Sequence, residues 1–220
     1  MKKSLSALLV VSAMTAAPAI ANDYYHGNKQ YQVTVTNLTK GISFTPLFAA
    51  THRSGVSLFT LGEPASYEIS RVAEGGDISG LMSQWNANRR VHMTTNTEGL
   101  LGPGESVTFT ISGKSRFNRL SMASMLLPTN DTLAALRGVE MPKWGSKTYR
   151  FKAFDGGSET NDELCANIPG PQCGGEPFSD DDPGEGYVYP SPGIHGEADL
   201  SRAAYQWQGA IGKVKITRIR

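Results

Sequence analysis

The stretch Tyr31-Gln32-Val33-Thr34-Val35-Thr36 alternates between polar and apolar or aromatic side chains and is rich in β-branched residues. A period of two places the alternate side chains on opposite faces of an extended chain. The segments Val107–Ile111 and Ile211–Ile219 repeat this pattern in the middle and at the end of the chain. Strands with one buried and one wet face are typical of antiparallel sheets. We therefore predict an all-β fold.

The rest of the chain alternates apolar runs with turn residues. Further strands are predicted over Ile42–Ala49, Leu120–Leu127, Tyr149–Phe154 and Gly186–Tyr189. The pattern also predicts two short helices. One covers Pro64–Val72, with Pro64 in its first turn, and the other covers Asp77–Asn88, with Asp77 as its cap and Leu81, Met82 and Trp85 on one face. This order of elements favours one antiparallel β-sandwich with short helical insertions over residues 22–220.

The N-terminus has the pattern of a cleavable signal peptide over residues 1–21. Lys2 and Lys3 precede an apolar run from Leu5 to Ala17, and Ala19-Ile20-Ala21 supplies the small residues that signal peptidase reads. A membrane anchor is the alternative, but the run is shorter than the roughly 20 residues that cross a bilayer. No later segment is apolar enough to cross. We expect an exported protein, either periplasmic or secreted, that begins near Asn22.

Charge is unevenly distributed along the chain, although its net value is only +1. Between Ala153 and Ser201 there is no Lys or Arg. The same stretch holds many acidic residues: Asp155, Glu159, Asp162, Glu163, Glu176, Asp180, Asp181, Asp182, Glu185, Glu197 and Asp199. Such a segment repels itself unless cations or backbone dipoles offset the charge. It argues against nucleic-acid binding, which requires a basic surface.

The two cysteines, Cys165 and Cys173, lie in the same acidic segment. A metal site and a redox pair are the alternatives to a disulfide, but their spacing fits neither a CxxC redox motif nor a zinc knuckle. Export places both thiols where disulfides form and persist. We predict a structural disulfide between them.

Several segments together resemble spondin N-terminal domains. The strand and loop Leu120–Asp131, the turn Phe154-Asp155-Gly156-Gly157-Ser158-Glu159 and the closing strand Val214–Ile219 carry the resemblance. Three further segments are similar to the bacterial exported single-domain members: Asn161–Cys165, Ile168–Pro171 and Gly193–Gly196. The resemblance covers nearly the whole mature chain.

The resemblance implies a β-sandwich similar to calcium-dependent lipid-binding domains, with a calcium ion at one end. In animals such domains act in matrix adhesion and receptor contact. The positions that match the family's calcium ligands are Asp131 and Asp155, whereas the segment Val107–Ser112 offers no third acidic ligand. We expect Glu159 or backbone carbonyls to complete the site.

The chemistry of the residues leaves a second interpretation open. Calcium takes six to eight oxygen ligands, and both aspartates lie where the chain turns and can aim carbonyl groups at an ion. Alternatively, Asp131 caps a helix over Asp131–Arg137, and Asp155 starts a turn. The run Asp180-Asp181-Asp182 is interpreted as a solvated loop.

Two other functions compete with a binding module. His195 with Asp199 could act as a general base in a metal-assisted hydrolase, although His26, His52, His92 and His195 lack zinc-site spacing. The tryptophans Trp85, Trp144 and Trp207 could line a carbohydrate-binding surface. The absence of a complete nucleophile–base set disfavours the hydrolase. With what the resemblance implies, we predict a non-enzymatic calcium-binding adhesion or interaction module. Its expected partner is an unknown envelope or extracellular protein or glycan.

Overall fold

The computed structural model describes residues 27–220, so the predicted signal peptide, residues 1–21, and His26 lie outside the described residues. The strands are β1 (Lys29–Asn37), β2 (Ser43–Phe44), β3 (Phe48–His52), β4 (Val91–Asn96), β5 (Ser106–Gly113), β6 (Arg119–Leu127), β7 (Thr132–Glu140), β8 (Ser146–Asp155), β9 (Tyr189–Pro190) and β10 (Gly212–Arg218). The helices are α1 (Tyr67–Gly75), α2 (Ser79–Ala87), the 3-10 turn η2 (Cys165–Asn167) and α3 (Arg202–Tyr205).

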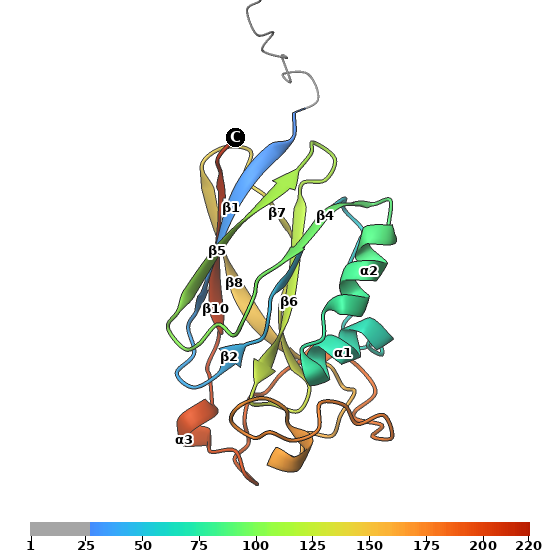
Figure 1. The fold of residues 1–220 in the computed structure, drawn as a ribbon, viewed down its shortest axis with the longest axis vertical. Helices are drawn as coiled ribbons and strands as arrows, with labels where there is room; N and C mark the ends of the chain where they lie inside the picture. Colours follow the sequence, from blue (N-terminus) through green and yellow to red (C-terminus); the bar gives the residue numbers. More distant parts are fainter. Residues whose placement is uncertain (1–26) are drawn as a thin grey trace, which may run out of the picture.

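The strands form one antiparallel sheet in the order β4-β3-β6-β7-β8-β10-β1-β5, with β2 paired to β6 and β9 to β8. Strand β8 joins the two halves, because residues 146–151 pair with β10 and residues 152–155 pair with β7. The sheet curls until its outer strands meet (Figure 1). There the Ser112 hydroxyl on β5 donates to Met93 Sδ on β4, at 3.1 Å. The predicted all-β antiparallel fold is confirmed, and its curvature makes it nearly a barrel.

Two apolar clusters fill the fold. The first lies inside the curled sheet, where alternate residues such as Val33, Val35, Ile111, Val214 and Ile216 are fully buried. The second lies between the outer face of the sheet and the two helices. Each large side chain removed from water contributes about 1.5–3 kcal/mol, so the period-two pattern of β1 and β10 decides which face points inward.

Both predicted helices exist with shifted ends. Helix α1 begins at Tyr67, because the Ser66 hydroxyl accepts a hydrogen bond from Ile69 N at 3.3 Å, and Pro64 lies before the helix. Asp77 accepts from Ser79 N at 2.8 Å, but the residue that caps α2 is Ile78. On α2, Leu81 and Trp85 are buried as expected.

The alternative helix over Asp131–Arg137 is wrong. Residues Thr132–Glu140 form β7, which pairs with β6 on one side and β8 on the other. Its Thr-Leu-Ala-Ala-Leu-Arg sequence carries good helix formers. Pairing and burial between two strands override that local preference.

The end of the molecule at the bottom of Figure 1 carries the long acidic segment. Strand β7 starts there and β8 ends there, in a register that places Thr132 opposite Asp155. The segment that follows β8 carries η2, β9 and α3. The two aspartates singled out from the sequence therefore lie on adjacent strand ends beneath this segment.

Candidate metal centre

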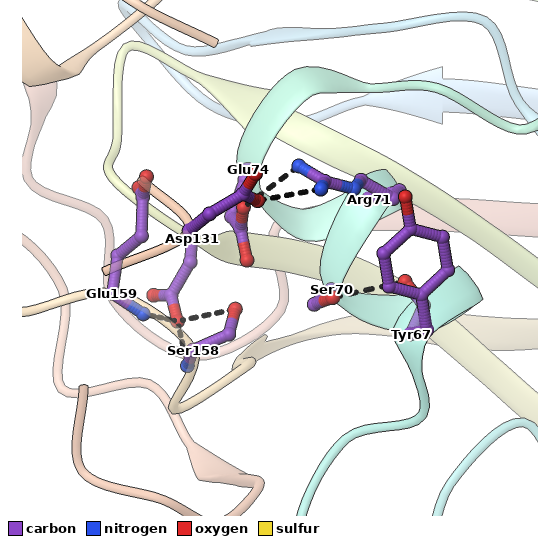
Figure 2. A network of polar contacts seen from close by, with 8 residues as sticks. Tyr67, Ser70, Arg71, Glu74, Asp131, Ser158 and Glu159 are labelled. Carbon is purple, nitrogen blue, oxygen red and sulfur yellow. Dashed lines mark hydrogen bonds and ion pairs between the residues drawn. The ribbon is translucent and has the colours of Figure 1, made fainter. Parts of the chain in front are cut away.

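Asp131 lies between β6 and β7 and is completely buried. Its carboxylate Oδ2 accepts hydrogen bonds from Ser158 N at 2.8 Å and Glu159 N at 3.2 Å, which Figure 2 shows. Its Oδ1 has no hydrogen-bond partner among the described residues. One oxygen thus holds the turn after β8, while the other remains free to accept from a ligand.

Asp155 is the last residue of β8 and is also completely buried. Its Oδ1 accepts from Gly157 N at 2.9 Å, and its Oδ2 accepts from the Asn161 side-chain amide at 2.9 Å. The same amide donates to Glu185 Oε1 at 3.0 Å. Asn161 therefore links Asp155 to the exposed Glu185 on the acidic segment.

Three carboxylates converge at this point. One oxygen each from Asp131, Asp155 and Glu185 lies within 4.8 Å of the other two. Burial, reinforced by the Asp155 charge, raises the pKa of Asp131 well above its usual value. Burial also raises the pKa of Asp155, to about 6. Repulsion and desolvation therefore disfavour the ionised pair until a cation compensates its charge.

Glu159 is buried next to this group but points elsewhere. Its side chain extends away from the Asp131 carboxylate (Figure 2). Neither carboxylate oxygen has a hydrogen-bond partner within residues 27–220. Burial, together with the charge of Glu74, raises the pKa of Glu159 to about 7. Glu159 lies outside the group of three converging oxygens.

The acidic segment is held against these residues by specific contacts. The Arg71 guanidinium on α1 pairs with Asp180 at 2.5 Å and lies over the rings of Tyr67 and Phe178. Asp182 accepts from Thr160 N and Gly184 N, both at 2.9 Å. The run Asp180-Asp181-Asp182 lies in a loop with Asp180 and Asp181 exposed, as interpreted from the sequence, and its first and third residues also tie the loop down through these contacts.

A glycine makes the close approach of this segment possible. Gly157 has a φ of 63°, and a Cβ on it would lie 2.2 Å from the Tyr187 carbonyl oxygen. The segment that carries Glu185 can pack here only because that side chain is missing. Sequence reasoning noted Glu185 among the acidic residues but gave no reason to place it beside Asp155. No local pattern connects positions that far apart.

The contacts at His195 are structural. Its backbone N–H and that of Gly196 donate to the buried Glu163 carboxylate, the second at 2.7 Å. Asp199 accepts from Cys165 N at 2.8 Å. Among the described residues, no hydrogen bond joins the His195 ring to Asp199. The ring lines a cavity of about 310 Å³ with Glu197 and Arg202, and no nucleophile converges on it there.

The tryptophans do not form a common surface. Trp85 is buried on α2 with its ring edge against Phe48, and Trp207 packs partly buried against the core. Only Trp144, which is 81% exposed, offers its ring to solvent. The three tryptophans therefore do not form the shared carbohydrate-binding surface that the sequence suggested.

Cys165 and Cys173 form the predicted disulfide. Both pack against a small cluster of Ile168, Ile194 and Leu200. This cluster lies in the segment after β8 and gives it a small apolar core of its own. Among residues 27–220, no helix has the length and apolar character needed to span a bilayer.

Residues 25–162 match the family model Spondin_N, and this range includes Asp131, Asp155 and Glu159. The chain belongs to the Spondin_N family. The Spondin_N family consists of non-catalytic extracellular modules, and the disulfide fits the same setting. The matched range ends before Glu185, the disulfide and β10. It is therefore shorter than the resemblance predicted from the sequence, which extends to the final strand. No curated protein matches this sequence significantly.

Proposed function

We propose that this Spondin_N protein is an exported, non-enzymatic interaction module that binds one calcium ion at the β7–β8 end of its sandwich. Asp131 and Asp155 supply the central carboxylates, and Glu185 closes the site from the loop side. Glu159 joins the ligands only if its side chain turns toward them. The ion fastens the acidic segment to the sheet. That segment then presents a fixed surface to an envelope or extracellular partner.

The buried, unpartnered Asp131 Oδ1 is the observation that carries this proposal. A buried acceptor without a partner costs about 1–3 kcal/mol, and more when it is charged. Here it lies within 4.8 Å of oxygens from two further carboxylates. A divalent cation among these oxygens turns their mutual repulsion into attraction. The alternative of a cap and a turn explains the bonded oxygens of Asp131 and Asp155, but not the unpartnered one.

The donor set favours calcium among the common divalent ions. All the candidate ligands are carboxylate oxygens, with no imidazole or thiolate among them, which disfavours zinc. Magnesium requires a tight octahedral shell and retains its waters, whereas calcium accepts irregular sets of six to eight oxygens. Backbone carbonyls and water would supply the remaining positions.

A thermal melt of the chelator-treated protein tests the proposal. Because an ion that binds only the folded state stabilises it by mass action, calcium should raise the melting temperature progressively with concentration. Magnesium at the same concentration should raise it less. An unchanged melting temperature in millimolar calcium would show that the site does not exist.

Two matched variants test which glutamate completes the site. Glu185→Gln and Glu159→Gln each remove one charge while keeping the shape of the side chain. If both glutamates are ligands, each variant should require more calcium for the same stabilisation. Without calcium, Glu159→Gln should also melt higher than the parent, because it removes a buried unpartnered carboxylate. A calcium response unchanged in one variant would remove that residue from the ligand set.

A further inference from the structure

The outward face of strands β8, β10, β1 and β5 carries positively charged side chains at alternate positions along neighbouring strands. These four strands lie side by side on the left of Figure 1. Their inward residues fill the core, so alternate residues point out into solvent. Four cations lie on this face: Arg150 and Lys152 on β8, and Lys213 and Lys215 on β10. We call this surface the cationic sheet face.

The remaining outward side chains are mostly hydroxyls. They are Ser146 and Thr148 on β8, Thr217 on β10, Thr34 and Thr36 on β1, and Ser106, Thr108 and Thr110 on β5. Hydroxyls bond across strands, as in the pairs Thr34–Thr108 at 2.9 Å and Thr36–Ser106 at 2.8 Å. These bonds order the hydroxyls into rows. Within these strands the exposed part of the face carries no carboxylate and no large apolar side chain, since Phe154 at the end of β8 is buried in the second apolar cluster.

The four cations lie close enough to repel one another, which destabilises the protein when no partner is bound. Lys213 lies directly opposite Arg150 in the β10–β8 register, with the two Cα atoms roughly 5 Å apart. Like charges in directly opposed positions destabilise a sheet. Among the described residues, none of the four cations forms an ion pair. A partner that carries negative charge would relieve this repulsion.

The chemistry of the face limits what that partner can be. Peripheral membrane binding relies on Trp, Phe or Leu side chains beside the cations. The exposed positions of the four strands carry none, and Trp144, which is 81% exposed, lies in the loop before β8 and outside these rows. Single-stranded nucleic acid requires aromatic rings on which its bases stack, and these are missing as well. An anionic polysaccharide needs only spaced cations for its acidic groups and hydroxyls for its sugar hydroxyls. Both are present here in rows along neighbouring strands.

We propose that the cationic sheet face binds an anionic polysaccharide, with Arg150, Lys213 and Lys215 contacting its acidic groups and the neighbouring threonines its sugar hydroxyls. The face is built by the sheet and not by the acidic segment. Binding there is therefore independent of the proposed calcium site, and either proposal can fail without the other.

Calorimetric titration with alginate, a polymer of uronic acids, tests this proposal, with neutral dextran as the comparison polymer. The protein should bind alginate and not dextran, and binding should weaken as salt is added because salt screens exposed charges. The triple variant Arg150→Gln, Lys213→Gln, Lys215→Gln should bind alginate at least about tenfold more weakly. All three side chains are exposed, so the variant should keep the parent's circular dichroism spectrum.

A charge-matched triple variant supplies the control. Arg89→Gln, Lys114→Gln and Arg116→Gln remove the same charge from exposed positions outside the face and should leave alginate binding unchanged. An equal loss in the control would mean that net charge alone is responsible and would overturn the proposal. Three other results would also overturn the proposal. The parent protein could bind dextran as tightly as alginate, or the first triple variant could bind alginate as tightly as the parent. The parent could also bind vesicles of anionic phospholipid more tightly than alginate.

Discussion

At the scale of single residues, buried carboxylates dominate the behaviour of this protein. Asp131 and Asp155 are fully buried, and each uses one oxygen to hold the turn after β8 through backbone N–H groups. Those bonds favour the ionised form, but burial outweighs them and raises the pKa of both groups. Ionising both groups in the folded state therefore costs free energy, and a cation bound as proposed would offset that cost.

Asp155→Asn should abolish most of the calcium-dependent stabilisation. The side-chain carbonyl can still accept from Gly157 N, so the turn is kept while the charge is lost. Without calcium, the variant should melt at least as high as the parent, because it no longer has to bury the charge of the Asp155 carboxylate. Differential scanning calorimetry with and without calcium measures both effects. Asp181→Asn is the matched control in an exposed position and should respond to calcium like the parent.

The pH dependence of the calcium-free protein follows from the raised pKa values. Asp155 and Glu159 have folded-state pKa values of about 6 and about 7, above those of an unfolded chain. The folded state therefore binds protons more tightly than the unfolded state. This contribution to stability is present at about pH 4 and is lost as the pH rises through 6 and 7.

Thermal melts across this range measure that loss. Without calcium, the melting temperature should fall between pH 5 and pH 8 by about 5 °C relative to an Asp155→Asn, Glu159→Gln double variant. Calcium should reverse the fall, and its effect should be larger at pH 8 because binding displaces protons. An equal fall in the double variant would assign the pH dependence to other groups.

At the scale of elements, Arg71 joins helix α1 to the acidic segment. Its guanidinium lies 4.2 Å from the centre of the Phe178 ring and 4.8 Å from that of Tyr67, and it pairs with Asp180 and Glu74. The Glu74 carboxylate is largely buried, and burial raises its pKa. Arg71 thus compensates a buried charge besides making an exposed ion pair.

Arg71→Ala should lower the free energy of unfolding by about 2 kcal/mol, through lost contacts with two rings and the uncompensated Glu74. Asp180→Asn removes only the exposed partner and should cost under about 1 kcal/mol. Urea unfolding of the two variants measures the difference. Equal costs would show that Arg71 contributes only through its pair with Asp180.

At the scale of the whole molecule, the sheet is closed by its last strand. Strand β10 lies between β8 and β1, so it connects β1 and β5 to the rest of the sheet. It also places Val214 and Ile216 in the main core. The range that matches the Spondin_N family ends well before it. The family match therefore covers most of the fold but not the strand that completes it.

A fragment of residues 25–162 should fail to fold. Removal of β10 leaves β8 and β1 with unpaired edges and exposes the core residues that β10 covers. Its circular dichroism spectrum should lack the strand signal of the full chain, and its amide protons should exchange without protection. Adding a peptide of residues 207–220 tests whether the missing strand is responsible. A fragment that unfolds cooperatively on its own would contradict this prediction.

Sequence alone determined the features that depend on local order. The alternation in β1, β5 and β10 predicted both their existence and their buried faces, because a period of two is a property of the extended chain itself. The two cysteines predicted their disulfide through spacing and export. Asp131 and Asp155 were singled out by the resemblance to spondin domains, whereas their local sequence alone also allowed a cap and a turn.

Only the tertiary structure decided what depends on distant neighbours. Strand β7 has a sequence that suits a helix, and its pairing with β6 and β8 makes it a strand. Glu185 reaches Asp155 only because the acidic segment folds back over Gly157, and the cationic sheet face exists only because β8 and β10 pair in one register. The pKa of a carboxylate likewise depends on burial. These properties arise from contacts between residues far apart in the chain, which local pattern does not encode.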